Sequence, residues 1–284
     1  MDYNFSGDLK TIRDILELSQ DELSAEIGIE QITLSKIEMG EVCPSSKLLE
    51  SIYSYAFNKN TRINKLKELL WRDDLGANRK LLFHGSKSEI IGNIDAHYGR
   101  QNNDFGQGFY AGETYEQSIS YVSGYNESSV YFLSFDDENL KCKKYEVNQD
   151  WMMTVAYYRG TLQNYEQNPI IKNLVKESRD CDYIIAPIAD NRMFQIINSF
   201  ISGEITDEQC KHCLAATNLG KQYIFISDKA ISQLDIIERC YISNNEREYY
   251  KNMRSEDSRL GDDKVKLARV QYRGQGKYID EILK

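Results

Sequence analysis

The sequence predicts an α+β protein in which a small all-α domain precedes a mixed domain with short, mostly antiparallel strands. Up to about residue 75 the apolar residues recur at helical spacing, whereas beyond residue 80 short apolar runs of strand length alternate irregularly with helical segments. The regular β-α alternation of a doubly wound sheet is missing. We therefore expect an all-α domain over 1–75, an α+β domain over 81–244 and a charged C-terminal extension over 245–284.

The composition is that of an ordinary soluble protein. Hydrophobic residues make up 41% and charged residues 28% of the 284 residues, and no apolar run approaches the roughly 18–20 residues of a membrane helix. The first residues, MDYNFSGDLK, carry acids where a signal peptide has a basic and then an apolar region. We therefore expect a cytoplasmic protein without a membrane partner. A net charge of −9 argues against nucleic-acid binding by the whole chain.

The six cysteines lack the density of a disulfide scaffold. Cys210 and Cys213, with His212 between them, could begin a zinc site, but no second Cys/His pair completes it. The segment also has a helical pattern that places both thiols on one face. We therefore predict free thiols in the core and no metal.

The first 58 residues predict four short helices, at about 9–16, 20–27, 30–39 and 45–53. Ser19 and Glu22 form a capping box that begins the second helix, and Gly28 ends it. The pattern is carried by Ser19-Gln20, Leu23, Gly28, Ser35, Ile37-Glu38, Gly40 and Pro44.

This pattern resembles the Cro/phage-repressor type of helix-turn-helix domain over about a fifth of the chain. The resemblance implies that the third helix enters the major groove of DNA. The residues that this helix would present to DNA are Gln31, Thr33, Ser35 and Lys36.

The charge of this segment leaves its role open. Residues 1–57 contain four basic residues against eleven Asp and Glu, a net charge of −7. DNA affinity comes largely from neutralising phosphates. The residues are thus compatible with sequence-specific DNA binding, and also with dimerisation, partner binding or auto-inhibition.

A further amphipathic helix is expected over 60–74, followed by a linker that contains Gly76 and Asn78. Beyond it, strands are expected at 81–83, 130–135, 144–147, 182–187, 222–226 and 236–242. Helices are expected at 114–122, 151–158, 191–201, around Cys210 and Cys213, and at 227–234. The tail predicts either a solvated helix or a strip that binds nucleic acid or a partner.

The stretch from Leu81 to Gly112 has the composition of a ligand cleft. It opens with a short strand that ends in His84-Gly85-Ser86, and it closes with Asp104-Phe105-Gly106-Gln107-Gly108-Phe109-Tyr110. Glycines let a ligand approach the backbone, and aromatic rings offer faces for stacking.

The order of strand-His84-Gly85, Gly108-Phe109-Tyr110 before a capped helix, and a late strand with Gln222-Tyr223 is similar to the ADP-ribosyltransferase superfamily. It resembles the branch with a His-Tyr-X triad, related to diphtheria toxin and the poly(ADP-ribose) polymerases. Within that branch it resembles a bacterial family of incompletely characterised domains with HGS, DFGxGFY and late QY motifs. The resemblance spans about Leu81 to Ile242.

The resemblance implies an NAD site. Its catalytic residues would be His84 on a ribose hydroxyl, Tyr110 on the nicotinamide ring and Gln222 in the third position, with the Gly85 backbone on the carboxamide. The residues implied to bind NAD are His84, Gly85, Ser86, Asp104, Phe105, Gly108, Phe109, Tyr110 and Tyr115.

Residue 222 departs from the superfamily, which usually has Glu there. An amide orients a hydroxyl but takes no proton. Another carboxylate could serve as the base, with Asp104, Glu113 and Asp190 as candidates, or the acceptor needs no strong base.

Three functions follow. The first is an NAD-dependent ADP-ribosyltransferase, a toxin or defence effector, acting for example in phage defence or as part of a toxin-antitoxin pair, that modifies a protein or nucleic acid. The second is a transcription regulator that senses NAD or a related nucleotide without turnover. The third is an NAD glycohydrolase. An antitoxin or inhibitory partner and a homodimer stay open.

Overall fold

A computed structural model describes residues 2–215 and 220–284 of the chain, which fall into two compact units. The first unit comprises Met1–Gly92, Thr114–Asp136 and Asp235–Met253. The second comprises Asn93–Glu113, Asp137–Leu234 and Arg254–Lys284. Because the chain passes several times between the units, each unit is assembled from segments that are distant in the sequence.

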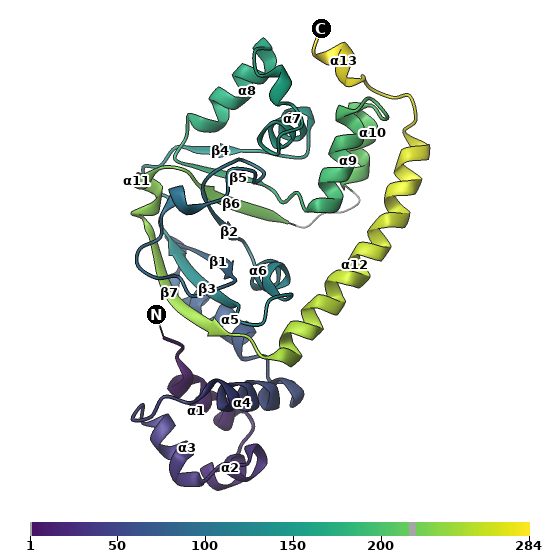
Figure 1. The fold of residues 1–284 in the computed structure, drawn as a ribbon. Coiled ribbons are helices and arrows are strands. Elements are labelled where there is room, and N and C mark those ends of the chain that lie inside the picture. Colours follow the sequence, from purple (N-terminus) through teal and green to yellow (C-terminus); the bar gives the residue numbers. More distant parts are fainter. Residues whose placement is uncertain (1, 216–219) are drawn as a thin grey trace. The chain divides into compact units, whose positions relative to one another are not determined.

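Four helices open the first unit: α1 (Phe5–Ile15), α2 (Gln20–Ile27), α3 (Gln31–Glu38) and α4 (Ser46–Asn58), coloured purple to blue in Figure 1. Their inner faces share one core, in which Leu9, Ile12, Leu34 and Ile37 have at most 1% of their surface exposed. The predicted capping box of α2 is present, and Gly28 ends that helix in the left-handed conformation.

The rest of the first unit is a three-stranded segment with helices. The strands β1 (Lys80–Ser86), β3 (Ser129–Phe135) and β7 (Leu234–Tyr241) are neighbours in that order, and β1 pairs antiparallel with β3. Helices α5 (Ile63–Leu75) and α6 (Tyr115–Val122) accompany them. A capping box formed by Thr114 and Gln117 begins α6, at the start predicted for this helix.

A buried ion network joins the helical segment of this unit to its strands. The ammonium group of Lys67 on α5 lies 2.5 Å from a carboxylate oxygen of Asp8 on α1 and 2.7 Å from one of Glu238 on β7. The Trp71 indole donates to Glu238 at 2.7 Å, and the Tyr53 hydroxyl donates to Asp8. All of the charged members have less than a tenth of their surface exposed.

The second unit is built on four strands in the order β4 (Cys142–Lys144), β5 (Tyr183–Pro187), β6 (Lys221–Phe225) and β2 (Phe109–Gly112). The β2/β6 and β5/β6 pairs are antiparallel, and β4/β5 is parallel. Among the described residues the strand pairs are therefore mostly antiparallel, as the sequence predicted.

Helices α7 (Gln149–Tyr158), α8 (Pro169–Arg179), α9 (Asn191–Ile201) and α10 (Asp207–Ala215) surround the core of the second unit, with two short 3-10 turns at Ala96–Tyr98 and Gln163–Tyr165 and the short helix α11 (Asp228–Ile231). The core contains Trp151, Ile197, Phe200 and Ile224, none of them exposed. Helix α8 was not predicted, although Asn168 caps it and Pro169 opens it.

The tail forms the 28-residue helix α12 (Asn244–Gln271) and the short helix α13 (Ile279–Ile282). The prediction of a helix is confirmed, but the tail is more than a solvated extension. Glu246 and Tyr250 are buried in the first unit, and Ala268 and Ile279 are buried in the second. No helix among the described residues is long and apolar enough to cross a membrane.

Candidate functional site

The predicted Asp104–Tyr110 motif forms a tight loop that leads into β2 in the second unit. Phe105 is 1% exposed and anchors the loop in the core. Gly106 has a φ of +71°, in the region that favours glycine. The Tyr110 hydroxyl closes the loop, since it donates to the Gly106 carbonyl at 2.8 Å and accepts the Phe105 N–H at 3.1 Å.

An arginine that the sequence analysis missed holds the outer side of this loop. Arg179, at the end of α8, donates to the carbonyls of Phe105 and Gln107 at 3.3 Å each and to the Tyr158 hydroxyl at 3.1 Å. A Cβ atom at Gly106 would lie 2.7 Å from its guanidinium nitrogen. The positive φ therefore favours glycine here, and an added Cβ would also displace the tip of the Arg179 side chain or the Tyr158 ring. No sequence pattern links Arg179 to a loop more than seventy residues earlier.

Asp104 forms the centre of a buried polar cluster. One carboxylate oxygen accepts from Arg159 at 2.8 Å and lies 2.6 Å from its second nitrogen. The other accepts the Ala189 N–H at 3.0 Å and the Gln222 side-chain amide at 2.8 Å. With Asp104 only 5% exposed, these donors use the carboxylate fully. The geometry therefore gives Asp104 an organising role and leaves it no position from which to take a substrate proton.

Gln222 projects from β6 on the same face as Tyr110. In the antiparallel register Gly112 lies opposite Gln222, and Tyr110 lies opposite Ile224, two residues further along each strand. The Gln222 nitrogen donates to Asp104 and, at 3.2 Å, to the Pro187 carbonyl. No donor among the described residues reaches its oxygen Oε1. The structure thus brings together three predicted residues, namely Asp104, Tyr110 and Gln222.

The environment of Tyr110 keeps its hydroxyl neutral. Burial raises the pKa of Tyr110 well above its usual value, and the negative charge of Asp104 raises it further. Its ring packs against the core of the second unit. The neighbouring Phe109 belongs to the other face of β2, where its ring centroid lies 6.3 Å from that of Phe225.

His84 lies on β1 in the first unit, opposite Tyr131 and on the strand face away from Phe83 and Phe132. It is half-buried. Ser86 ends the strand opposite Ser129. Both residues are thus partly buried positions at the C-terminal end of β1. Because His84 and the cluster around Asp104 belong to different units, the three-part site of His84, Tyr110 and Gln222 stays a prediction.

Packing explains two of the glycines assigned to NAD. A Cβ atom at Gly85 would lie 2.4 Å from the Ser118 carbonyl oxygen, because β1 runs close to α6. A Cβ at Gly108 would lie 2.9 Å from the Ile224 side chain. Their roles in binding a ligand backbone stay predictions.

Tyr115 fills the core of the first unit. It has no exposed surface, and its hydroxyl donates to Glu246 at 3.0 Å and accepts from Asn64 at 3.0 Å. In this conformation its ring has no open face for a ligand. Tyr115 directly follows Thr114, the N-cap residue of α6.

The two other candidate bases differ from each other. Asp190 caps α9 by accepting the Met193 N–H at 2.9 Å, an ordinary structural task. Glu113 directly follows β2, and its charge acts on Tyr223, the residue after Gln222. Burial, followed by the charge of Glu113, raises the pKa of Tyr223 to about 12.

The third helix, α3, presents the predicted DNA-contacting side chains. Gln31 and Lys36 are exposed, and Thr33 and Ser35 are partly exposed. The Gln31 amide donates to the Gln20 side chain at 2.6 Å.

Glu38, at the end of the same helix, points inward. It is 3% exposed, accepts from Arg13 at 2.9 Å and accepts from Gln20 at 2.7 Å. Its negative charge is therefore compensated inside the unit, rather than displayed beside Lys36.

Comparison with known families bears on both parts of the chain. Residues 9–52 match the family described as Helix-turn-helix. Residues 81–236, more than half of the chain, match the family described as Protein of unknown function (DUF3990). The chain belongs to the DUF3990 family. No curated protein and no solved structure matches it.

The DUF3990 segment contains all three predicted catalytic residues, and it contains the Asp104 cluster with Arg159 and Arg179. The helix-turn-helix match begins and ends within the predicted N-terminal domain. The comparisons therefore support a helix-turn-helix domain joined to a DUF3990 domain, and they assign no reaction to the second.

The cysteines of the DUF3990 protein are free where the structure describes them. The thiols of Cys210 and Cys213 are buried in the core of the second unit and face the carbonyls of Ile196 and Val265. His212 stacks on Tyr272, with ring centroids 3.5 Å apart. The predicted core position of both thiols is confirmed.

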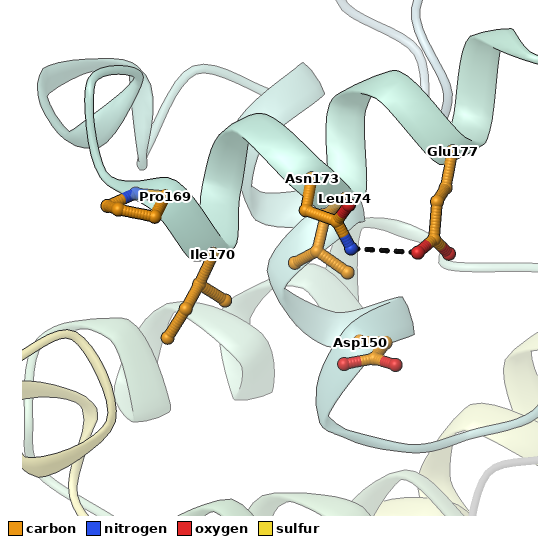
Figure 2. A pocket seen from close by; sticks show the side chains of 6 residues that line it. All are labelled: Asp150, Pro169, Ile170, Asn173, Leu174 and Glu177. Carbon is orange, nitrogen blue, oxygen red and sulfur yellow. Dashed lines mark hydrogen bonds between the residues drawn. The ribbon is translucent and has the colours of Figure 1, made fainter.

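A surface cavity of about 320 Å³ lies between α7 and α8, away from the predicted residues. Figure 2 shows its lining, which comprises Asp150, Pro169, Ile170, Asn173, Leu174 and Glu177. Asn173 donates to Glu177 at 2.8 Å, and Lys143 lies 2.5 Å from the same carboxylate. The hydrogen bond from Lys143 lowers the pKa of Glu177. Because its carboxylates are paired or exposed and no ligand-specific group faces it, this cavity suggests no reaction.

Proposed function

We propose that this DUF3990 protein is an NAD-dependent ADP-ribosyltransferase that modifies a protein or nucleic acid, and that its helix-turn-helix domain binds DNA. The observation that carries the enzymatic part is the cluster of Asp104, Tyr110 and Gln222. Gln222, more than a hundred residues later in the chain, donates to Asp104 and lies on the same face of the β2/β6 pair as Tyr110. Their order along the chain resembles that of the superfamily.

The residues of this cluster suit the chemistry of NAD. In the transfer, the bond between ribose and nicotinamide breaks, nicotinamide leaves, and the ribose carbon bonds to the acceptor, which loses a proton. Since nicotinamide is a good leaving group, the protein mainly has to position the ribose and the acceptor. The Gln222 oxygen offers a hydrogen-bond acceptor for a hydroxyl group, and the ring of Tyr110 offers an aromatic face.

One observation favours a second function, nucleotide sensing without turnover. Asp104 is saturated by Arg159, Ala189 and Gln222, and an amide cannot act as a base. In that case the DUF3990 domain would bind NAD and pass the signal to the DNA-binding domain. An NAD glycohydrolase differs from the transferase only in using water as acceptor.

Turnover of labelled NAD in a cell extract separates these functions. We expect release of nicotinamide and transfer of label to a macromolecule. We expect Gln222→Ala and His84→Ala each to lower turnover by about two orders of magnitude, because positioning groups contribute factors of that size. Cys43→Ala, a change at an exposed thiol of the other domain, serves as the matched control.

Each other outcome has a distinct meaning. Label found only in free ADP-ribose indicates the glycohydrolase. Binding of NAD without nicotinamide release supports the sensor. If wild-type protein neither binds nor consumes NAD, the proposed function is wrong.

A further inference from the structure

The orientation of the Gln222 amide is dictated by its surroundings. Its nitrogen lies 2.8 Å from an oxygen of Asp104 and 3.2 Å from the carbonyl oxygen of Pro187. Both neighbours are acceptors, so an amide turned the other way would place oxygen against two oxygens. The nitrogen must therefore face inward, and Oε1 faces away from Asp104 and Pro187.

We propose that Asp104 is a positioning residue that fixes the Gln222 amide so that its oxygen Oε1 receives a substrate hydroxyl. This inference rests on the proposed function, because the hydroxyl it assigns to Oε1 is that of an NAD ribose. Asp104 is then not a base. It is the group that determines which atom of the Gln222 amide faces the substrate.

Asp104 is held firmly enough for this role. Arg159 binds its other oxygen at 2.6 and 2.8 Å, and the Ala189 N–H binds the oxygen shared with Gln222 at 3.0 Å. Arg159 itself stacks over the ring of Phe194, with 4.7 Å between the guanidinium carbon and the ring centroid. The carboxylate thus has a fixed position and a compensated charge, and it can impose one orientation on its neighbour.

The same contacts predict how a glutamate at position 222 would behave. A carboxylate there would lie against the carboxylate of Asp104 and the carbonyl of Pro187. Burial and the like charge both raise the pKa of such a pair, which then retains one shared proton. With that proton facing Asp104, the outer oxygen still accepts a hydroxyl. When the proton is lost, the pair repels and the orientation is lost.

The test is the pH dependence of NAD binding and of nicotinamide release in Gln222→Glu. The wild-type dissociation constant of NAD should stay nearly constant between about pH 5.5 and pH 8.5, because an amide does not titrate. For Gln222→Glu, we expect an affinity close to wild type at about pH 5.5 and a loss of about tenfold or more by about pH 8.5. If residue 222 served instead as a general base, Gln222→Glu would gain turnover as pH rises.

A second variant tests Asp104 directly. In Asp104→Asn the new amide faces the Gln222 nitrogen donor to donor, so NAD affinity should fall by about tenfold. Asp104→Asn combined with Gln222→Glu restores a donor-acceptor pair and should recover most of that loss at about pH 8.5. Both variants lose the acceptor of the Ala189 N–H equally, so their difference reports residue 222 alone.

Gln209→Glu is the matched control. Gln209 is 5% exposed in the same unit, and its amide donates to the Arg269 carbonyl at 2.8 Å. Its variant should lose thermal stability as pH rises while NAD affinity stays constant with pH.

The outcomes distinguish a failure of the proposed function from a failure of this inference alone. If wild type does not bind NAD, the proposed function and this inference are both overturned. If wild type binds NAD, but Gln222→Glu shows no pH dependence or the double variant shows no recovery, the inference alone is overturned.

Discussion

The carboxyl group of Glu246 lies among polar side chains in the core of the first unit. It accepts from the Tyr115 hydroxyl at 3.0 Å and from the Asn64 amide at 3.1 Å. Burial raises the pKa of Glu246 to about 7, against the effect of these hydrogen bonds. The titration of Glu246 therefore links the stability of the protein to pH in the physiological range.

The sign of this effect follows from the pKa in the two states. A folded pKa above the unfolded value favours folding while the group is protonated. This contribution is complete below the unfolded pKa of about 4.5 and is lost as pH rises through about 7. Each pKa unit corresponds to about 1.4 kcal/mol, so the loss is on the order of 3 kcal/mol.

We predict that Glu246→Gln removes most of this pH dependence. The variant should be more stable than wild type at about pH 8 by a few kcal/mol and close to wild type at about pH 4.5. Urea unfolding at both pH values measures this. A difference that does not change with pH would show that Glu246 does not titrate in this range.

Among the secondary-structure elements, those with strong local signals were predictable. Capping residues placed the starts of α2 and α6 correctly, because a side chain three residues from the cap reports the helix start directly. The strand β4 was predicted too late, at residues 144–147, since its three residues pair with β5 and carry no run of apolar residues. Its existence depends on a partner forty residues away.

In the candidate site, too, the residues with local sequence signals were predictable and their long-range contacts were not. Asp104, Tyr110 and Gln222 were identifiable because glycines and aromatics mark the loop and an apolar run marks β6. Their actual contacts were not, because Arg159 and Ala189 reach Asp104 from distant segments without a motif. The burial of Tyr115 was not predictable for the same reason, since its partner Glu246 lies 131 residues later.

For helix α3 we make a separate prediction, which concerns DNA binding. We expect Lys36→Ala to weaken binding to the DNA upstream of the gene by about threefold to tenfold and to reduce the salt dependence by about one ion. Fluorescence anisotropy at several salt concentrations measures both. Lys10→Ala, an exposed lysine on α1, is the matched control. Equal effects of both changes, or no binding at low salt, would contradict DNA recognition by α3.

At the scale of the whole molecule, the helix-turn-helix segment is held to the strands of its own unit by buried charges. Lys67 lies between Asp8 and Glu238, so two ion pairs link α1 to β7 through α5. Burial raises the pKa of Asp8, and the charge of Lys67 opposes that rise. The helical segment is thus part of a larger cooperative structure.

We predict that Lys67→Met is strongly destabilising, by about 3–5 kcal/mol, because it leaves two buried carboxylates without their cation. The loss should shrink at low pH, where the Asp8 carboxyl, whose pKa is raised by burial, becomes protonated. Urea unfolding followed by tryptophan fluorescence measures it, since Trp71 contacts Glu238.

Lys65→Met on the same helix is the control. Lys65 pairs with Glu68 and Glu116 and keeps a third of its side chain exposed, so its loss should cost at most about 1 kcal/mol. Similar costs for both lysines would show that the buried network contributes little.

The helix α12 has one further consequence. The family match ends at residue 236, yet Tyr115 inside it depends on Glu246 and Tyr250 beyond it, and the core of the second unit includes Ala268 and Ile279. The range that matches the family is therefore shorter than the range of residues that build the cores around it. A protein that contained only residues 81–236 would need other side chains to cover Tyr115, because Glu246 and Tyr250 would be missing.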